Sequence, residues 1–342
     1  MSVYDHYACD GQMAFDDYLL SPAKINKKIR LIELFAGVGS QAMALRNIGA
    51  DFEHYRVVEF DKYAMASYNA IHGTNFETSN ICDVGGVDLG IRDTDVYTYI
   101  MTYSFPCQDL SVAGKMRGMA EGSGTRSSLL FEVGRLLDEV EELPQILLME
   151  NVPQVISKKN EEAFTKWKNT LEWKGYKNYI QLLNAKDYGV AQSRNRCFMV
   201  SILGEQGYQF PKPIPLNKCM KDYLEDEVDE KYYIKSEKAK ILIDKLIIGG
   251  KLLTDRQTDR QLISVSSPQE QLTQQIVLKH DTMPEYQTSK QTEQESVNGL
   301  GYIDKGTGKH QSNMVYDTNG LLPCEYAVQW KEPTKVVEWK KI

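Results

Sequence analysis

The fold is decided by residues 29–40, which read IRLIELFAGVGS. The first six residues are largely apolar, which is typical of a strand buried inside a parallel sheet. Gly37 and Gly39 follow at once, and the residues after them suit the start of a helix. A buried strand that leads into a glycine turn and then a helix predicts the first unit of an α/β fold.

Strand and helix patterns alternate from residue 29 to about residue 203. The sequence predicts strands at residues 30–35, 55–59, 98–103, 145–150, 179–184 and 196–202. It predicts helices at residues 40–48, 63–71, 128–141 and 160–174. This alternation predicts a doubly wound, mostly parallel sheet of the α/β class.

Changes in composition predict two domains and an extension. Residues 1–28 form an N-terminal extension with a possible short helix at 13–20, and residues 29–203 form the α/β domain. Three closely spaced prolines follow, and residues 204–342 are then rich in polar and glycine-containing segments, with an apolar helix at 239–248. We interpret this last region as a second, smaller and more irregular domain.

Composition limits the class of protein without assigning a function. The chain of 342 residues has a net charge of −7, which argues weakly against a nucleic-acid partner. No apolar run is long enough to span a bilayer, and the first residues do not resemble a signal peptide. The six cysteines include no Cys-x-x-Cys pair, so a zinc site or a disulfide framework is not expected. These features favour a reducing cytoplasm.

The glycine turn carries the pattern of a nucleotide-binding loop. Gly37, Gly39 and Ala42 form a Gly-x-Gly-x-x-Ala motif, and Glu59 follows at the end of the next predicted strand. Glycines let the backbone approach a ligand, and a carboxylate at that place accepts hydrogen bonds from ribose hydroxyls. By itself the motif fits a nicotinamide or flavin cofactor as well, or a tight turn with no ligand.

A cysteine and a carboxylate follow two further strands. Cys107 lies in SFPCQ, residues 104–108, and a glycine-rich stretch at 111–124 comes next. A thiolate there can attack an electrophilic carbon, although a single cysteine is more often a buried apolar side chain. Glu150 ends the strand at 145–150, where it can donate a proton or simply cap the following turn.

Two arginines precede the last predicted strand. Arg194 and Arg196 are two residues apart, so their side chains point to the same side of an extended chain. Together they can hold a carboxylate or a phosphate, although basic residues at a strand edge are often just solvated.

Taken together, these segments resemble the cytosine-5 DNA methyltransferase family. The segments that match in order and spacing are LFAGVGS at 34–40, EFD at 59–61, FPCQ at 105–108, MENV at 149–152 and QSRNR at 192–196. The resemblance covers residues 29 to about 215. It implies S-adenosylmethionine as the cofactor, in place of a nicotinamide or flavin, and no metal. An amino-methyltransferase is disfavoured because no Asp/Asn-Pro-Pro-Tyr/Phe segment is present.

The resemblance implies a catalytic site and a reaction. Cys107 would add to carbon 6 of a flipped-out cytosine, which makes carbon 5 nucleophilic. Glu150 would bond ring nitrogen 3 and the exocyclic amine. Arg194 would contact the base carbonyl, and Arg196 would orient Glu150. The glycine-rich stretch would close behind the base, with Arg126 as a phosphate contact.

The resemblance also implies a cofactor site. By this analogy Phe35 packs on the adenine, Glu59 binds the ribose and Asp83 takes the adenine amine. Phe60 adds a second apolar wall. The full expected set is Phe35, Ala36, Gly37, Gly39, Glu59, Phe60, Asp83, Pro106 and Leu129.

The expected partner is double-stranded DNA, in the cytoplasm of a bacterial or phage-infected bacterial cell. Residues 204–342 would recognise the target sequence in the major groove, through side chains in 251–262 and 305–313. The family's Arg-x-Leu-Thr-type and Gly-Asn-Ser segments, and the helix that returns to the cofactor, are not found. A second polypeptide supplying them is therefore one expectation. The alternatives are a truncated, weakly active or inactive DNA-binding or regulatory homologue and a cytosine-5 transfer RNA methyltransferase.

Overall fold

The structure is a computed structural model that describes six segments of the chain: residues 25–110, 118–224, 237–249, 299–302, 314–317 and 335–337. The chain divides into two compact units. The first is Met1–Leu183 with Asn195–Lys212, and the second is Asn184–Arg194 with Pro213–Ile342. This division places the loop before the last long strand in the second unit.

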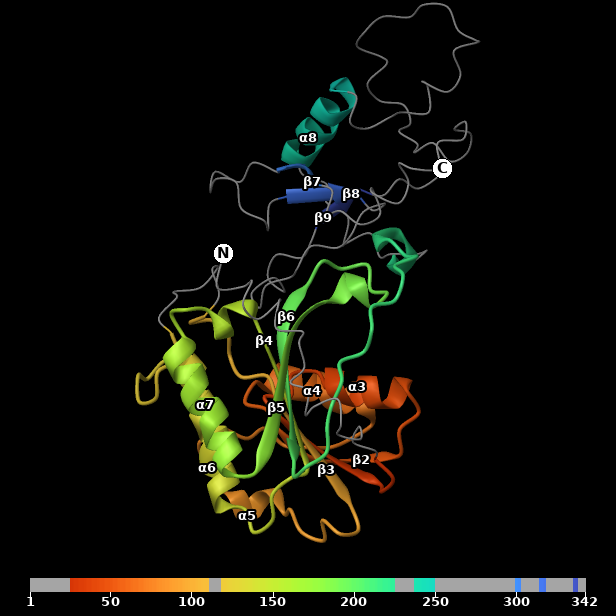
Figure 1. The fold of residues 1–342 in the computed structure, drawn as a ribbon. Coiled ribbons are helices and arrows are strands. Elements are labelled where there is room, and N and C mark those ends of the chain that lie inside the picture. The colour runs from red at the N-terminus through yellow and green to blue at the C-terminus, as the bar shows by residue number, and fades with distance from the viewer. Residues whose placement is uncertain are drawn as a thin grey trace, which may run out of the picture. The chain divides into compact units, whose positions relative to one another are not determined.

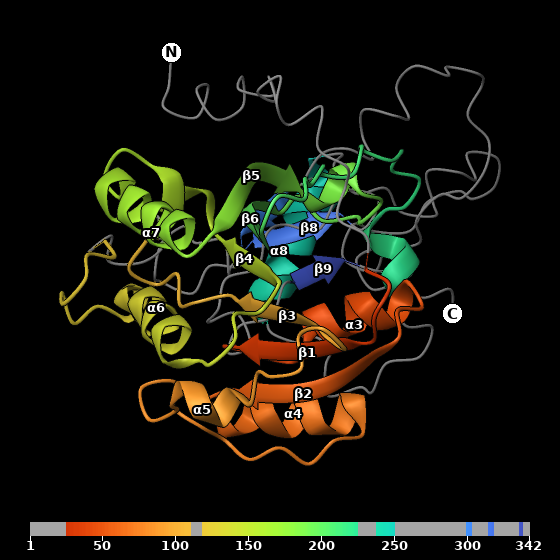
Figure 2. The same cartoon turned by 60° about the horizontal axis from the view of Figure 1, so that its bottom comes forward.

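The first unit is built on one six-stranded sheet. Its strands are β1 (Ile29–Leu34), β2 (Phe52–Val58), β3 (Thr98–Tyr103), β4 (Ile146–Asn151), β5 (Tyr176–Asn184) and β6 (Asn195–Leu203). They lie in the order β2-β1-β3-β4-β6-β5, which can be followed in Figure 2. β1 to β4 pair in parallel, whereas β6 runs antiparallel to β4. The carboxyl ends of β1 to β4 therefore share one edge with the amino end of β6.

Helices cover both faces of this sheet. They are α3 (Ser40–Asn47), α4 (Lys62–His72), α5 (Gly86–Leu89), α6 (Leu130–Glu139) and α7 (Glu161–Trp173). Leu31 of β1 packs with Ala42 of α3, whereas the next residue, Ile32, belongs to the core built with α6 and α7. Because neighbouring strand residues point to opposite faces, α3 lies on one face and α6 and α7 lie on the other (Figure 1). The expected doubly wound, mostly parallel α/β fold is confirmed.

Local sequence explains where the elements near the site begin and end. β3 is buried along its whole length, as suits a central strand with both faces covered. α4 begins after Asp61, whose carboxylate accepts hydrogen bonds from the first turn of the helix, and ends at Gly73 in a left-handed conformation. These caps fix the ends of the helix that flanks the loop after β1.

The structure departs from the expected elements at several places, and β2 and β5 each begin three residues earlier than expected. Phe35, expected as the last residue of a strand, has a φ of 57°, so β1 ends one residue earlier. The helix expected at 128–141 is divided into a 3₁₀ turn, Arg126–Leu129, followed by α6. The short helix Gly86–Leu89 was not expected, because four residues are too few to show a helical period.

In the second unit, the described residues contain one longer helix and a small sheet. The helix is α8 (Glu237–Ile248), close to the apolar helix expected at 239–248. β7 (Gly299–Tyr302) pairs antiparallel with β8 (Met314–Asp317), and β8 pairs in parallel with β9 (Lys335–Val337). These elements lie within the region expected to recognise the target.

Three expected features lie outside the described residues. They are the helix at 13–20, the part of the glycine-rich stretch at 111–117, and the base-reading segments at 251–262 and 305–313. All three stay predictions.

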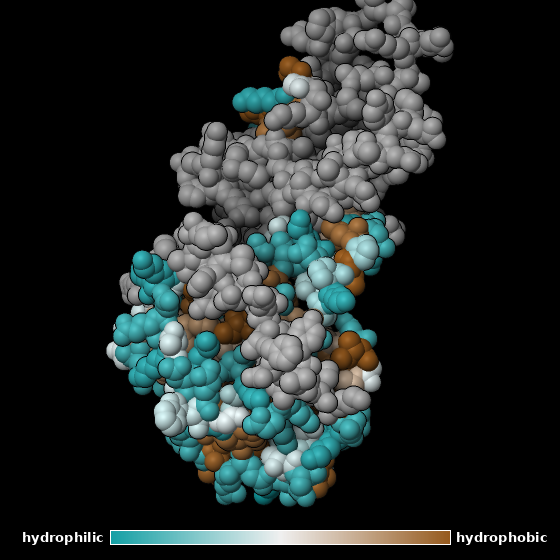
Figure 3. All heavy atoms as spheres, in the orientation of Figure 1, coloured by the Kyte–Doolittle hydropathy of each residue, from teal (hydrophilic) through white to brown (hydrophobic). Residues whose placement is uncertain are grey.

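The surface drawn in Figure 3 is mostly hydrophilic over the described part of the first unit, with hydrophobic side chains scattered singly or in small groups. None of the described helices is long and apolar enough to cross a bilayer. The described residues also hold no group of three or more His, Cys, Asp or Glu side chains placed to bind a metal ion.

Candidate active site

Four elements of the first unit deliver functional groups to one edge of the sheet. β1 leads into a glycine loop, residues 35–39, and β3 leads into an elbow, residues 104–107, that ends at Cys107. Glu150 is the last residue but one of β4, and Arg196 is the second residue of β6, which starts at this edge. The crevice outside the carboxyl ends of the strands is the usual ligand site of such a sheet.

The glycine loop has an unusual backbone with one open side. Phe35, Gly37 and Gly39 all have positive φ, at 57°, 57° and 78°. A Cβ added to Gly37 would meet no atom within 4 Å, whereas one added to Gly39 would lie 2.6 Å from the Tyr68 ring. Gly39 is therefore required by close contact with α4, while Gly37 leaves room for a ligand to approach the backbone.

Glu59 connects the end of β2 to this loop. Its Oε2 accepts a hydrogen bond from the Gly37 N–H at 2.8 Å, and its Oε1 accepts one from the Asp61 N–H at 2.7 Å. Each carboxylate oxygen has a second acceptor site, so the half-buried Glu59 can still receive hydroxyl donors. Phe60, next in the chain, is 76% exposed and presents its ring to solvent.

The opposite wall of the expected cofactor site is held by α6. Asp83 is exposed in the loop after Ile81, and Leu129 is half-buried at the turn that precedes α6. Arg135 of α6 donates from Nη2 to the carbonyls of Ile81 and Val84, at 3.0 and 2.9 Å. This guanidinium fixes the backbone on both sides of Asp83.

These features fit a nucleoside cofactor. The open backbone at Gly37 can accommodate close approach, and Glu59 offers acceptors to a ribose. The exposed Phe60 ring offers an apolar face that a purine can cover. Ala36 is a buried residue of the loop itself, and Pro106 is half-buried at the elbow.

The elbow that carries Cys107 is pinned by side chains from three other segments. Asn151 Nδ2 donates to the Phe105 carbonyl at 3.0 Å, and Ser127 Oγ donates to the Pro106 carbonyl at 2.7 Å. Gln41 Nε2 also donates to the Ser104 hydroxyl, at 3.3 Å. Asn151 and Ser127 are buried, and so is the Phe105 side chain, which leaves Cys107 half-buried at the end of a fixed turn.

The environments of the other described cysteines separate them from Cys107. Cys197 of β6 is fully buried, and burial together with the nearby Glu150 charge raises its pKa to about 12. Cys82 is exposed beside Asp83. Its pKa is also raised, first by partial loss of solvent around the thiol and then by the nearby carboxylates. Cys219 is buried in the second unit. Only Cys107 of the described cysteines combines the sheet edge with partial exposure.

Glu150 and Arg196 form an ion pair across β4 and β6. Arg196 Nε lies 2.9 Å from Glu150 Oε1, with side-chain exposures of 12% and 22%. The pair arises because β6 runs antiparallel to β4, with Glu150 opposite Phe198. A guanidinium on one carboxylate oxygen fixes the orientation of the other.

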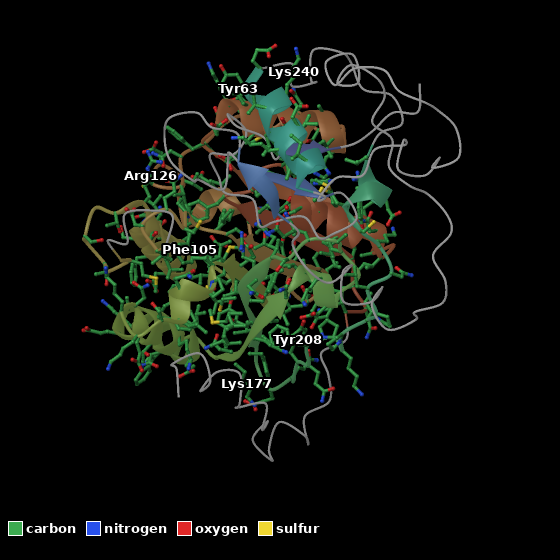
Figure 4. The ribbon with its side chains drawn as sticks, turned by 90° about the horizontal axis from the view of Figure 1, so that it is seen from above. Tyr63, Phe105, Arg126, Lys177, Tyr208 and Lys240 are labelled. Atoms are coloured by element: carbon green, nitrogen blue, oxygen red, sulfur yellow. The ribbon has the colours of Figure 1, made fainter. Side chains whose placement is uncertain are left out.

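Arg194 is placed differently from Arg196. It ends the loop that groups with the second unit, and its N–H donates to Asn184 Oδ1 at 2.9 Å. Its carbonyl accepts from the Ala185 N–H at 3.0 Å, which closes the loop. Arg126 lies on the surface of the first unit (Figure 4), where Nη1 donates to Gln108 Oε1 at 2.7 Å.

Several residues of this edge were not singled out from the sequence. Ser127 and Arg135 gave no signal, since each acts through a contact with a distant part of the chain. Asn151 stood inside a quoted motif, but nothing in the pattern indicated its bond to the elbow. These roles come from tertiary contacts.

Comparison of the sequence with known proteins identifies a family whose model matches most of the chain. The sequence model of the C-5 cytosine-specific DNA methylase family matches residues 29–340. The match therefore includes the six-stranded sheet and most of the chain that follows it.

Three relatives illustrate the similarity. The type II methyltransferase M2.ScrFI of Lactococcus lactis subsp. cremoris is 34% identical over 259 residues, which cover 62% of this chain and 71% of that protein. The orphan methyltransferase M.SssI of Spiroplasma monobiae is 36% identical, covering 60% and 67%. The type II methyltransferase M.HhaI of Haemophilus parahaemolyticus is 33% identical, covering 64% of each chain.

Proposed function

Because the chain belongs to the C-5 cytosine-specific DNA methylase family, we propose that it methylates carbon 5 of a cytosine in duplex DNA. The observation that carries the proposal is the shared sheet edge, where the Cys107 elbow, the Glu150–Arg196 pair and the glycine loop meet. A nucleophile, an acid and a cofactor loop are what this chemistry needs.

Cys107 would act first, as a nucleophile. Its thiolate sulfur forms a bond to carbon 6 of the ring, and the electrons of the 5,6 double bond move toward ring nitrogen 3. Carbon 5 then has enamine character and can attack a methyl group. When bound, S-adenosylmethionine supplies that methyl group from its sulfonium, which leaves as a neutral thioether. The carbon 5 proton would then pass to solvent water, the carbon 6–sulfur bond would break with its electrons going to the Cys107 sulfur, and the proton at ring nitrogen 3 would return to Glu150, which restores the aromatic ring.

Glu150 would stabilise the charge that develops on the base. A carboxyl group at ring nitrogen 3 can share or donate a proton as electrons arrive there. Arg196 Nε lies 2.9 Å from Glu150 Oε1, and this ion pair would orient the carboxyl group for its contact with the base. Arg194 would contact the base carbonyl, as the family resemblance suggests.

We assign the cofactor residues that the family resemblance suggests. Gly37 and Gly39 would shape the loop, Ala36 is its buried residue, and Phe35 and Phe60 would enclose the adenine. Glu59 would accept hydrogen bonds from the ribose hydroxyls, and Asp83 would accept one from the adenine amine. Pro106 and Leu129 would complete the wall.

The target base would have to leave the duplex to reach Cys107, since carbon 6 is stacked inside a helix. Arg126 is exposed and could pair with a phosphate of the DNA backbone. We assign target recognition to residues 204–342 and the reaction to the cytoplasm of a bacterium or a phage-infected bacterium.

Transfer of a labelled methyl group tests this function. Incubation with tritiated S-adenosylmethionine should label cytosine in duplex DNA, and nuclease digestion should yield 5-methylcytosine. Label in transfer RNA instead of DNA would favour the RNA alternative. DNA that shifts in a gel without taking up label would favour a non-catalytic homologue. Label that appears only after a second polypeptide is added would fit a supplied C-terminal segment.

Ser127→Ala tests whether the elbow needs the hydrogen bond from the Ser127 hydroxyl to the Pro106 carbonyl. Loss of the donor to the Pro106 carbonyl should let Cys107 shift, so kcat should fall by about 10-fold or more, with DNA affinity unchanged. Steady-state kinetics and a binding assay separate the two effects. Ser201→Ala is the matched control. This buried serine donates to Asn178 Oδ1 at a distance of 2.6 Å, and neither residue belongs to the elbow. Equal loss of kcat in both variants would contradict the role of Ser127 in positioning the elbow.

A further inference from the structure

The carboxylate of Glu33 is fully buried directly below the glycine loop. Its exposure is 0%, and burial raises its pKa, against the effect of the two hydrogen bonds it accepts. Tyr68 O–H donates to Oε2 at 2.6 Å, and the Ala42 N–H donates to Oε1 at 3.3 Å. Glu33 thus links α4 to the first turn of α3, the helix that the glycine loop begins.

The hydrogen bonds of this group run in one direction. Tyr68 has a single hydroxyl proton, which it gives to Glu33. His54 Nδ1 lies 2.6 Å from the same hydroxyl oxygen, and with Glu33 ionised this leaves His54 as the donor, with its proton on Nδ1. Burial lowers the pKa of His54, helped by the charges of His72 and Arg46, which favours the neutral ring. The chain of donors from His54 through Tyr68 ends on Glu33.

α4 also holds the loop directly. His72, one turn after Tyr68, places Nε2 at 3.0 Å from the Val38 carbonyl and can donate to it. At Gly39 the backbone is so close that a Cβ would lie 2.4 Å from His72 Nε2. The segment from Phe35 to Ala42 is therefore held by α4 at the Val38 carbonyl and at Gly39, and by Glu33 of β1 at the Ala42 amide.

The loop needs such support because of its backbone. Phe35 adopts a positive φ that residues with a side chain rarely take, and two glycines with positive φ follow within four residues. Such conformations persist where the surroundings over-determine them, often at ligand sites. Sequence alone gave no reason to connect Glu33, Tyr68 and His72 to this loop.

We propose that Glu33, Tyr68 and His72 are positioning residues that hold the glycine loop in the shape required to bind S-adenosylmethionine. The inference rests on the proposed function, since it assigns these contacts to the cofactor site of that reaction. They set cofactor affinity and act away from the reacting atoms. Their loss should weaken cofactor binding while methyl transfer at saturating cofactor continues.

Tyr68→Phe is the sharpest test, because it removes one oxygen and keeps the ring. The Kd for S-adenosylhomocysteine, measured by titration calorimetry on the full chain, should rise by about 5- to 10-fold. KM for S-adenosylmethionine should rise by a similar factor, and kcat and KM for DNA should stay near wild type. Tyr176→Phe is the matched control. This buried tyrosine donates to the Pro144 carbonyl at a distance of 2.7 Å, and neither residue belongs to the glycine loop. It should lower the Tm to a similar extent and leave the Kd unchanged.

His72 allows a test by conservative rescue at a partly exposed position, where misfolding is not expected. His72→Leu removes the donor to Val38 and should raise the Kd by about 3-fold or more. His72→Gln keeps an N–H donor and should restore most of the affinity.

The outcomes distinguish an error in the positioning role from an error in the proposed function. If wild type fails to bind S-adenosylhomocysteine, the proposed cofactor, and with it the function, is wrong. If wild type binds and Tyr68→Phe and His72→Leu bind equally well, only the positioning role is overturned. A Kd change that Tyr176→Phe reproduces at the same loss of Tm would also overturn it, because the effect would then be general destabilisation.

Discussion

Replacing Cys107 with serine is expected to lower methyl transfer by about 10⁴-fold or more, the scale on which covalent catalysts lose activity without their nucleophile. A serine hydroxyl is almost wholly protonated near neutral pH and adds poorly to carbon 6, so carbon 5 stays unreactive. The fold should survive, because Cys107 is only half-buried and the elbow is held by Asn151 and Ser127. Bisulfite sequencing of DNA co-expressed with each variant would measure the loss.

Cys82→Ser is the control for this substitution. Cys82 is exposed and lies outside the elbow, so its loss should leave methylation intact. DNA protected equally by wild type and Cys107→Ser would contradict the assignment of the nucleophile. Loss of methylation in both variants would point to a different role for thiols in this chain.

Glu150→Gln is expected to lower kcat by roughly 10²- to 10³-fold, the usual cost of removing one group that stabilises developing charge. The amide keeps an oxygen that can accept from Arg196 but has no acidic proton that it can transfer to ring nitrogen 3. KM for DNA should change little, because the group acts mainly as charge develops. Single-turnover kinetics with saturating DNA would measure the chemical step.

Glu53→Gln is the matched control for Glu150→Gln. Glu53 Oε1 pairs with Arg30 Nε at 2.6 Å, between β2 and β1, at the edge of the sheet opposite the site. Each substitution removes the negative charge that pairs with a partly buried arginine, so each should lower the free energy of unfolding by about 1 kcal/mol. Only Glu150→Gln should slow the reaction. Similar rate losses in the two variants would contradict a chemical role for Glu150.

Patterns along the chain predicted the main features of the first unit. The apolar runs around Leu31 and Met101 identify strands, and the glycines after the first run identify the loop. Cys107 and Glu150 could be placed at a common edge because parallel strands carry their carboxyl ends there. The fold class followed from the same alternation.

Other features depend on contacts that a linear pattern does not contain. Phe35 leaves its strand through a positive φ, although the residue itself favours extended structure. Ser127 bonds a carbonyl 21 positions away, and Tyr68 bonds a carboxylate 35 positions away. The buried Glu33 reads as an ordinary polar residue in a strand until its partners are known. Tertiary packing decides each case.

Residues after 204 were harder to interpret for a different reason. Their composition is polar with little periodicity, so neither the strand nor the helix template applies over long stretches. The apolar pattern at 239–248 did predict a helix, and α8 occupies Glu237–Ile248. Which side chains read bases depends on the DNA they would contact, and no single-residue pattern encodes that.

Covalent trapping tests the central claim most directly. A duplex carrying 5-fluorocytosine at the target site blocks loss of the group at carbon 5, so the sulfur of Cys107 should stay attached after methyl transfer. With S-adenosylmethionine present, the account predicts a complex that survives denaturing electrophoresis, with mass spectrometry locating the base on the peptide that contains Cys107. Transfer of methyl groups to ordinary duplex DNA with no such complex, or attachment at another residue, would contradict it.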